Sequence, residues 1–499
     1  MLATLVSSFL HLFSPTLLLY LVAGSLFGLI MGFIPGIGGI FTLVMLLSFV
    51  FFVPPEAGIV LLLSAHALVE TSGSITGILF GVPGSPTNAA TVLDGYPMAQ
   101  KGQAGRAIGA AVSASALGGI FGAIILLLFI PIMRPVVMSF GPAEILFLSL
   151  LGVATISVLS AGNPLKGVVV GLIGVLLSLV GQDWVTGAMR YTYGLEYLWD
   201  GFHILPVFLG LFAVSEMISL SISGGEISKV SAARIEDSPI KGLIDTLKHW
   251  WLVVRCAVIG VLTGFIPGLG GVTAGFLSYG YAAVTMGKSK EKMGTGEVVG
   301  VIGPESANNA KEGGGLIPTI AFGIPGTPGM VILIGALTVM GITPGVDMLG
   351  PKIDTVFLMV AILVVSNIVG AAMIFPVIKY LAIFTRINVR ILAPIILVIT
   401  TIAAFNSARS LGDIITLAVF GVLGYEMKKL GYSRPALSIG FILGVGIERN
   451  MWLAYNVYGF GMFQRPTVFI GLIILAVIVL IPFIKKRLPN LTERWRGNG

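Results

Sequence analysis

Two nearly identical stretches rich in glycine and proline constrain this chain most. Gly-Phe-Ile-Pro-Gly-Ile-Gly-Gly begins at Gly32, and Gly-Phe-Ile-Pro-Gly-Leu-Gly-Gly begins 232 residues later at Gly264, so seven of eight positions are identical. Each copy directly follows an apolar run. A helix in lipid satisfies its own backbone polar groups, and proline with several glycines interrupts that arrangement. Paired breaks in corresponding places of two halves are typical of a transporter's binding site.

The composition places these breaks in a membrane. Hydrophobic residues make up 56% of the chain and charged residues only 10%, whereas soluble domains carry about 25% charged residues. The apolar runs are long enough for helices of about 20 residues, which cross a bilayer. The alternating short strands of a membrane barrel are absent from the sequence. We therefore expect an all-α polytopic protein embedded in the lipid bilayer.

Several classes of function lack support in the sequence. A single cysteine, Cys256, excludes an internal disulfide and offers no metal-binding or redox pattern. The net charge of +7 is modest, and no nucleic-acid-binding signature is present. The serines and histidines show neither a nucleophile elbow nor a zinc-binding pattern, so we do not expect an enzyme. No cofactor is expected beyond a coupling ion.

A second motif is also duplicated. Gly-Val-Pro-Gly-Ser-Pro begins at Gly81 and returns as Gly-Ile-Pro-Gly-Thr-Pro at Gly323, 242 residues later. The same offset aligns Glu70 with Glu312, so a carboxylate precedes the break by eleven residues in both halves. Two motifs that recur in the same order indicate internal duplication of the chain.

The duplication divides the chain into three parts. We predict an N-terminal membrane repeat over residues 1–222 and a C-terminal membrane repeat over residues 251–499. Residues 223–250 form the one long polar stretch and are predicted to link the repeats. Apolar residues from Ile240 to Leu247 keep helical spacing within this linker, which predicts an amphipathic helix on the membrane surface.

The charges of matched loops differ between the halves. Lys101 and Arg106 follow the second break of the first half, whereas Asp347 and Asp354 flank a single lysine at the corresponding place of the second half. Before that break the bias is reversed, because residues 286–297 carry three lysines and residues 51–58 carry no Lys or Arg. Positively charged loops stay in the cytoplasm. The pattern predicts two inverted-topology repeats with discontinuous helices or re-entrant hairpins.

The breaks bring together groups that suit both anions and Na⁺. The start of a half-helix presents free N–H groups and a partial positive charge, while unwound carbonyls suit Na⁺. The two Gly-Pro motif pairs contain no Lys or Arg, so anion binding would rest on amides, hydroxyls and a bound cation. The uncharged donors and acceptors near the breaks are Ser85, Thr87, Asn88, Asn308, Asn309 and Thr327. Of these, we expect Ser85, Thr87, Asn88 and Thr327 to contribute to a Na⁺ site.

Two carboxylates are candidates for coupling. Glu70 and Glu312 lie in or beside apolar runs, where ionisable groups are costly and usually functional. Alternatively, Glu70 is a helix-end carboxylate at the membrane surface, and Glu312 forms a local ion pair with Lys311. We expect His66 to be a packed core residue and Asp94 to mark the end of a loop.

These motifs resemble a known family. The two Gly-Phe-Ile-Pro-Gly-x-Gly-Gly copies, the run from Gly81 to Met98 and the Gly-Ile-Pro-Gly-Thr-Pro stretch are similar to the large membrane subunit of tripartite tricarboxylate transporters (TctA-like). The resemblance covers essentially the whole chain. The motif residues that it implies as binding residues are Pro35, Gly36, Gly38, Gly39, Gly81, Pro83, Gly84, Ser85, Pro86, Thr87, Asn88, Pro267, Gly268, Gly270, Gly271, Gly323, Pro325, Gly326, Thr327 and Pro328. The second half has Gly329-Met330 in place of Thr87-Asn88, so the halves cannot contribute identical ligands.

The resemblance implies a function as well as a fold. It implies a secondary active transporter of the bacterial inner membrane that imports di- or tricarboxylates such as citrate, coupled to a cation, usually Na⁺. It further implies a small membrane subunit and a periplasmic solute-binding protein that delivers the carboxylate substrate. Coupling to H⁺ and a channel-like pore for other small organic anions are the alternatives. A purely structural membrane subunit would not need two breaks in each half.

Overall fold

The computed structural model describes residues 2–34, 38–50, 52–160, 164–183, 185–222, 235, 237–267, 270–286, 292–378, 380 and 389–487. Helices make up most of these residues, as the apolar runs predict. The sheet in this part of the chain has two short strands, β1 (Gly181–Gln182) and β2 (Met189–Arg190), which pair antiparallel. The predicted all-α character is therefore confirmed.

The chain forms two compact units, and each draws on both halves of the sequence. The first comprises Met1–Met138 and His203–Tyr425, and the second comprises Ser139–Phe202 and Glu426–Gly499. The predicted division at residues 222 and 250 concerns duplication in the sequence and stays a prediction. The helices of the first unit are α1 (Leu2–Leu12), α2 (Pro15–Gly32), α3 (Gly38–Val50), α4 (Pro55–Phe80), η1 (Pro86–Asn88), α5 (Ala89–Gln100), α6 (Ala104–Met138), α9 (Ile204–Phe208), η3 (Leu209–Val214), α10 (Ser215–Ile222), α11 (Pro239–Lys248), α12 (Trp250–Phe265), α13 (Gly270–Thr285), α14 (Val299–Phe322), α15 (Pro328–Val339), α16 (Val346–Leu349), α17 (Ile353–Val377), α18 (Val389–Ala408) and most of α19 (Leu411–Lys429). Those of the second are α7 (Pro142–Ser160), α8 (Pro164–Ser178), η2 (Glu196–Leu198), α20 (Arg434–Tyr458), η6 (Gly459–Gln464) and α21 (Pro466–Arg487).

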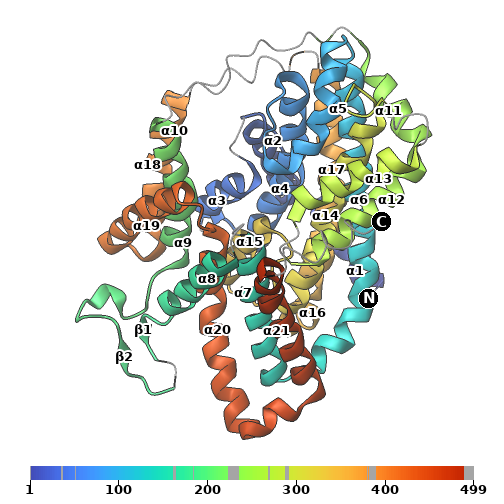
Figure 1. Ribbon diagram of the computed structural model, residues 1–499. Helices are drawn as coiled ribbons and strands as arrows, with labels where there is room; N and C mark the ends of the chain where they lie inside the picture. The colour runs from blue at the N-terminus through green and yellow to red at the C-terminus, as the bar shows by residue number, and fades with distance from the viewer. Residues whose placement is uncertain are drawn as a thin grey trace. The chain divides into compact units, whose positions relative to one another are not determined.

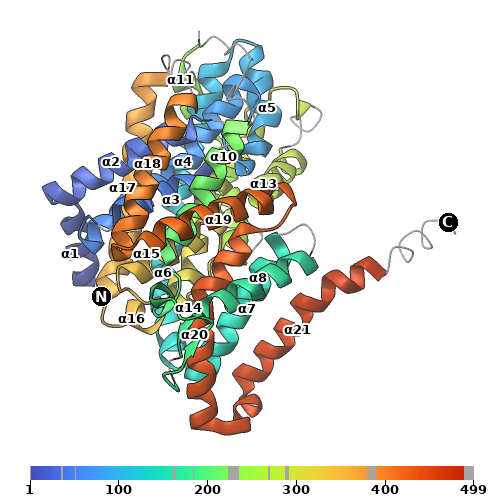
Figure 2. The ribbon, with the colours of Figure 1, turned by 90° about the vertical axis from the view of Figure 1, so that its left-hand side faces the viewer.

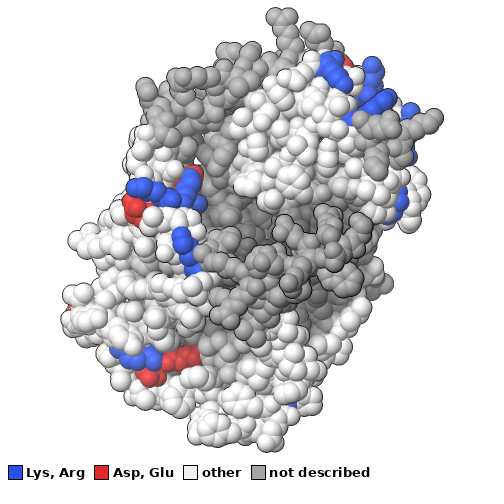
Figure 3. Space-filling view, in the orientation of Figure 1, with Lys and Arg blue, Asp and Glu red and all other residues white. Residues whose placement is uncertain are grey.

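Several helices have the length and composition of membrane spans. Among the described residues, α2, α4, α6 and α17 qualify by themselves. Two bent pairs raise the number to six: α11 with α12, bent by 80°, and the segment Arg434–Gln464 with Pro466–Val477, bent by 74°. Figure 3 shows a face on which charged side chains gather in a few places and most of the described surface is uncharged. These features are those of a multi-pass membrane protein.

Two buried helices, α4 and α14, carry the site. Every described residue from Ala57 to Phe80 in α4 and from Val299 to Ala321 in α14 is buried. A helix that is enclosed all round lies in the core of a large or membrane protein. Figure 1 shows α14 among α6, α12 and α13, and all three pack against it. Polar residues on such helices have no access to the surface, so their contacts must come from neighbouring helices.

The second break has the same local structure in both halves. Gly81 and Gly323 end α4 and α14 with left-handed φ angles of 70° and 66°. Ser85 and Thr327 are extended, and the proline after each begins the next helix. Glycine adopts the left-handed conformation without steric cost, and proline suits the first turn of a helix. Sequence chemistry thus ends one helix and starts the next within a few residues, and the predicted discontinuous helices are present at this motif pair.

Packing around the breaks is also duplicated. In the first half α2 packs on α4, and in the second α12 packs on α14. Short helices precede both pairs: α1 packs on α17 and α11 packs on α6. Figure 2 shows α17 beside α1 and α2. The opposite orientation of the two halves in the membrane stays a prediction.

The predicted amphipathic helix of the linker is present as α11. Its apolar residues Ile240, Ile244 and Leu247 are 58%, 44% and 53% exposed. The carboxylate of Asp237 accepts hydrogen bonds from two backbone N–H groups at the start of α6, which ties α11 to that helix. An exposed apolar face and the sharp bend before α12 fit a helix that lies on the membrane surface. Residues 223–234 and 236 of the linker lie outside the described part.

Candidate functional site

The first turns of α3 and α13 lie close to polar residues of the neighbouring helices and of the first-half break. A Cβ atom on Gly39, in the first turn of α3, would lie 3.0 Å from Glu70 Oε1. A Cβ atom on Gly271, in the first turn of α13, would lie 2.7 Å from Thr87 Cγ2. The first N–H groups of a helix have no partner within it and carry partial positive charge. The start of α3 therefore favours the negative charge of Glu70, whereas the start of α13 lies against Thr87 and the side chain of Lys311.

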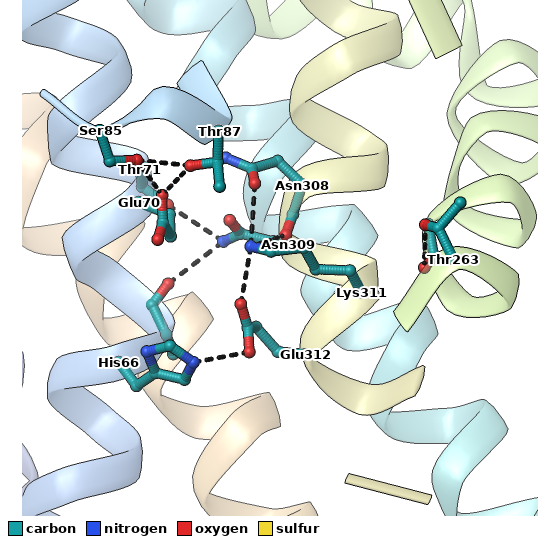
Figure 4. A network of polar contacts seen from close by, with 12 residues as sticks. His66, Glu70, Thr71, Ser85, Thr87, Thr263, Asn308, Asn309, Lys311 and Glu312 are labelled. Carbon is teal, nitrogen blue, oxygen red and sulfur yellow. Dashed lines mark hydrogen bonds and ion pairs between the residues drawn. The ribbon is translucent and has the colours of Figure 1, made fainter. Parts of the chain in front are cut away.

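Glu70 is the centre of an oxygen-rich cluster (Figure 4). Ser85 Oγ lies 2.6 Å from Glu70 Oε2, and Thr87 Oγ1 donates to the same oxygen. Asn88 Nδ2 donates to the backbone carbonyl of Glu70 at 2.9 Å, while Asn88 Oδ1 lies 2.9 Å from Ser85 Oγ. Glu70, Ser85 and Asn88 are buried. The three polar residues of the first-half break thus gather around Glu70, two at its carboxylate and Asn88 at its backbone carbonyl, and we call this group the Glu70 cluster.

Glu312 has a different environment from Glu70. Its carboxylate lies 2.7 Å from Lys311 Nζ and 2.7 Å from His66 Nε2, and all three residues are buried. Lys311 Nζ also donates to the backbone oxygen and the side-chain oxygen of Asn308, each at 2.9 Å (Figure 4). The local ion pair with Lys311, which the sequence left open, is present. His66 is packed in the core, as expected, and its Nε2 atom also contacts the Glu312 carboxylate.

Asn309 connects three helices. Its Nδ2 atom lies within hydrogen-bond distance of Thr71 Oγ1 (3.0 Å) and the Ala67 carbonyl (3.3 Å) on α4, and of Asn367 Oδ1 (2.9 Å) on α17. These contacts hold α4, α14 and α17 together. Asn308, in contrast, binds Lys311 and leaves its own Nδ2 without a hydrogen bond in the described structure. The Asn309 side chain therefore joins three helices, whereas the Asn308 side chain binds the ammonium group of Lys311.

Thr327 does not join the Glu70 cluster. It is buried, and its Oγ1 has no hydrogen-bond partner among the described residues. Thr87 is replaced by Gly329 in the second half, and a Cβ atom on Gly329 would lie 2.8 Å from His66 Nε2. The second break therefore packs on the His66–Glu312 pair where the first break supplies hydroxyl groups to Glu70.

The glycines of the second motif are packing residues. A Cβ atom on Gly84 would lie 2.7 Å from the Gly32 carbonyl, and one on Gly326 would lie 2.5 Å from Gly315 Cα. Gly73 and Gly264 complete these two close backbone contacts. Since the contacts of the two halves match under the sequence offsets, each break is held against the preceding helix by backbone alone.

Most of the remaining predicted residues lie at helix starts or in turns, and three lie outside the described part of the chain. Pro86 and Pro328 begin helices, and Gly38 and Gly270 have left-handed φ angles of 66° each. Pro267 lies in the turn after α12, and Pro83 and Pro325 belong to the breaks themselves. Pro35, Gly36 and Gly268 lie outside the described residues.

Sequence reasoning missed Glu305, and its expectation that Asp94 marks the end of a loop is wrong, because Asp94 lies within α5. Glu305 is fully buried in α14 and accepts hydrogen bonds from three hydroxyl groups. Asp94 is fully buried and accepts from Tyr279 Oη and from the backbone N–H groups of residues 294, 296 and 297. An ionisable residue directly after the apolar run 298–303 was a signal for Glu305. Nothing in the local sequence marked Asp94 as the anchor of a distant loop.

A cavity of about 370 Å³ lies away from these groups. It lies between α1, α4 and α17, at the opposite end of α4 from its break. Its lining residues are Ser7, Ser8, His11, Glu56, Asp354, Thr355 and Leu358. Glu70 and Glu312, by contrast, are enclosed by their own partners, so the charged centre is closed to solvent in this conformation.

Comparisons with known proteins agree with this architecture. The family described as tripartite tricarboxylate transporter TctA matches residues 18–439. A protein of Agrobacterium vitis named "Uncharacterized 52.8 kDa protein in TAR-I ttuC' 3'region" is 31% identical over 438 residues, which are 88% of this chain and 87% of that protein. A second from the same organism, "Uncharacterized protein in TAR-II ttuC' 3'region", is 32% identical over 192 residues, 38% of this chain and 79% of that protein. No solved structure matches.

The family match spans both motif pairs, both buried helices and every described residue of the two charged clusters. The resemblance seen in the Gly-Pro motifs is thereby confirmed, and the chain belongs to the tripartite tricarboxylate transporter TctA family.

Proposed function

We propose that this chain is a cation-coupled carrier that moves carboxylates across the bacterial inner membrane, with Na⁺ bound at the Glu70 cluster. The observation that carries the proposal is the convergence of the Ser85 and Thr87 hydroxyl groups on the buried carboxylate of Glu70, with Asn88 bound to the backbone carbonyl of Glu70 and to Ser85. A broken helix and the carboxylate that precedes it by eleven residues are thus one site.

The chemistry of the Glu70 cluster favours Na⁺. Hard cations prefer oxygen ligands, and the cluster offers a carboxylate, two hydroxyl oxygens and an amide oxygen. Among the described residues no Lys, Arg or His forms an ion pair with Glu70, so its negative charge is available to a cation. Coupling to H⁺ at the same carboxylate is the alternative.

The carboxylate substrate needs positive charge from another source. Lys311 is held by Glu312 and Asn308, so its charge is already compensated. The starts of α3 and α13, together with a cation at Glu70, provide the remaining positive potential. Substrate would then bind only after the cation, which couples the two fluxes.

Partners and movement follow from the family and from the duplication. We infer that a small membrane subunit and a periplasmic solute-binding protein work with this chain, and that the latter delivers a di- or tricarboxylate such as citrate. Two inverted repeats would give alternating access around the paired breaks. The matched packing of α2 on α4 and of α12 on α14 supports such a pseudo-symmetric arrangement.

Uptake by proteoliposomes with the partner subunits tests the proposal, with Na⁺ and pH gradients imposed separately. Thr87→Val and Asn88→Leu should each weaken uptake and raise the Na⁺ concentration needed for half-maximal rate. Thr263→Val is the matched control, since this buried hydroxyl bonds only to backbone oxygens of its own helix. Unchanged Na⁺ and substrate dependence in both test variants would contradict the assignment. Flux that does not saturate and ignores the Na⁺ gradient would favour a channel instead.

A further inference from the structure

Glu305 is a buried carboxylate that the Glu70 cluster does not include. Its side chain is fully enclosed in the N-terminal third of α14. Ser74 donates to Oε1 at 2.5 Å and Thr91 donates to the same oxygen, while Ser115 donates to Oε2 at 2.7 Å. These hydroxyl groups come from α4, α5 and α6. Three different helices therefore aim an O–H group at one carboxylate.

The charge of Glu305 has no cationic partner. Within the described residues, no Lys, Arg or His forms an ion pair with it. A buried charge without a partner is costly, and such groups often become neutral by binding a proton. Oxygen–oxygen distances of 2.5–2.7 Å are those of O–H···O hydrogen bonds, so the three hydroxyl groups bind the carboxyl oxygens directly. The ligand that suits this site is a proton.

The groups around Glu305 do not remove the cost of its charge. On α4 the carboxylate of Glu70 repels it, and on its own helix Lys311 is engaged with Glu312. On α5 Asp94 packs against Gly300 of α14, and on α12 Cys256 packs against Gly303 of α14. The helices α6 and α17 present Ser115 and Asn367 to α14, and on α13 Tyr279 donates to Asp94.

Ser74 has two acceptors within reach. Its Oγ lies 2.5 Å from Glu305 Oε1 and 3.3 Å from the backbone carbonyl of Glu70. A hydroxyl group has one proton to donate. When Glu305 is ionised, Ser74 donates to it; when Glu305 carries a proton, its own O–H can donate to Ser74, which then turns to the Glu70 carbonyl. Both arrangements satisfy every group without any movement of the backbone.

This pair of arrangements reaches the Glu70 cluster through Asn88. Asn88 Nδ2 donates to Ser74 Oγ at 2.7 Å and to the Glu70 carbonyl at 2.9 Å. Asn88 thus binds both Ser74 Oγ and the Glu70 carbonyl oxygen, the two atoms that form a hydrogen bond with each other in only one of the two arrangements. Protonation of Glu305 therefore alters the hydrogen bonds of Asn88, whose Oδ1 atom lies 2.9 Å from Ser85 Oγ.

We propose that Glu305 is a proton-binding site, and that its protonation switches the Ser74 hydroxyl from Glu305 to the backbone carbonyl of Glu70. A hydronium ion of the solvent gives the proton: one of its O–H bonds breaks, an O–H bond forms on the carboxylate, and a water molecule is left. The effect of this switch on transport rests on the proposed function, whereas proton binding itself does not. Glu305 is thus a pH-sensitive element next to the proposed cation site.

Infrared difference spectroscopy of the purified protein tests proton binding without transport. The carbonyl stretch of a protonated carboxyl group is separate from carboxylate bands, so a band should grow as the pH falls and be absent from Glu305→Gln. Glu144→Gln is the matched control, because Glu144 is buried but paired with Arg465 and Thr467. The band should persist in that variant. An identical titration in Glu305→Gln, or no titrating band in the unmodified protein, would overturn the proposal.

Ser115→Ala provides a second variant that keeps the carboxyl group. The ionised form of Glu305 loses one of its three donors, so the midpoint of the infrared titration should move to higher pH. In proteoliposomes the pH profile of uptake should shift in the same direction. An unmoved midpoint would contradict proton binding at this hydroxyl cage. A moved midpoint with an unmoved uptake profile would refute the link to transport, and the Na⁺ dependence of Thr87→Val and Asn88→Leu would still decide the proposed function separately.

Discussion

Glycines within one helix, α13, permit a quantitative test of the broken-helix structure. Gly270 is its first residue and has a φ angle of 66°. A Cβ atom at this position would meet no atom within 4 Å. Gly270→Ala therefore leaves packing unchanged and perturbs only the left-handed backbone. That conformation costs an alanine about 1–2 kcal/mol, which should appear as a loss of unfolding free energy.

Gly280, in the interior of the same helix, is the control. A Cβ atom there would also meet nothing within 4 Å, and its φ angle is not left-handed. Alanine is favoured over glycine in a helix interior by about 1 kcal/mol. The two substitutions are chemically identical, yet they should change the unfolding free energy in opposite directions. The expected difference between the variants is about 2–3 kcal/mol.

Gly38→Ala extends the test to the first half. Its φ angle is also 66°, and its Cβ atom would make an ordinary contact with Ser85 Cβ at 3.4 Å. We expect the same destabilisation as at Gly270, measured by chemical unfolding in detergent, together with reduced uptake in proteoliposomes. If Gly38→Ala and Gly270→Ala raised the unfolding free energy as much as Gly280→Ala does, the left-handed conformation of Gly38 and Gly270 would be refuted. Full uptake by both variants would show that the starts of α3 and α13 are not part of the transport site.

Two further predictions concern charge and topology. Lys311→Met and Glu312→Gln should each destabilise the protein by about 3–5 kcal/mol, because each breaks the buried Lys311–Glu312 ion pair by removing one of its charges. The double variant should lose less than the sum, and additive losses in a double-mutant cycle would contradict the ion pair. In a Cys256→Ser background, Glu56→Cys and Lys292→Cys should react with membrane-impermeant reagents from opposite sides of the membrane, as the loop charges predict. Labelling of both from one side would rule out inverted repeats.

The sequence by itself determined the features whose causes are local. Low charge and long apolar runs require a membrane protein, and the Gly81–Pro86 motif ends one helix and begins the next. The duplication predicted that Gly323 and Pro328 would do the same. Ser85, Thr87 and Asn88 were identified because they stand directly at the first break, and Glu70 because a carboxylate is costly in an apolar run.

The tertiary structure alone decided which distant groups meet. Glu70 and Glu312 occupy matching positions in the sequence, yet Glu70 receives hydroxyl groups and Glu312 receives Lys311 and His66. Glu305 binds hydroxyl groups from α4, α5 and α6, which are separated from it by about 190 residues or more. Local sequence sets where a helix begins and ends, because the backbone conformations of Gly and Pro are intrinsic. The partners of a buried charge depend on how helices from both halves pack, and no short stretch of sequence contains that information.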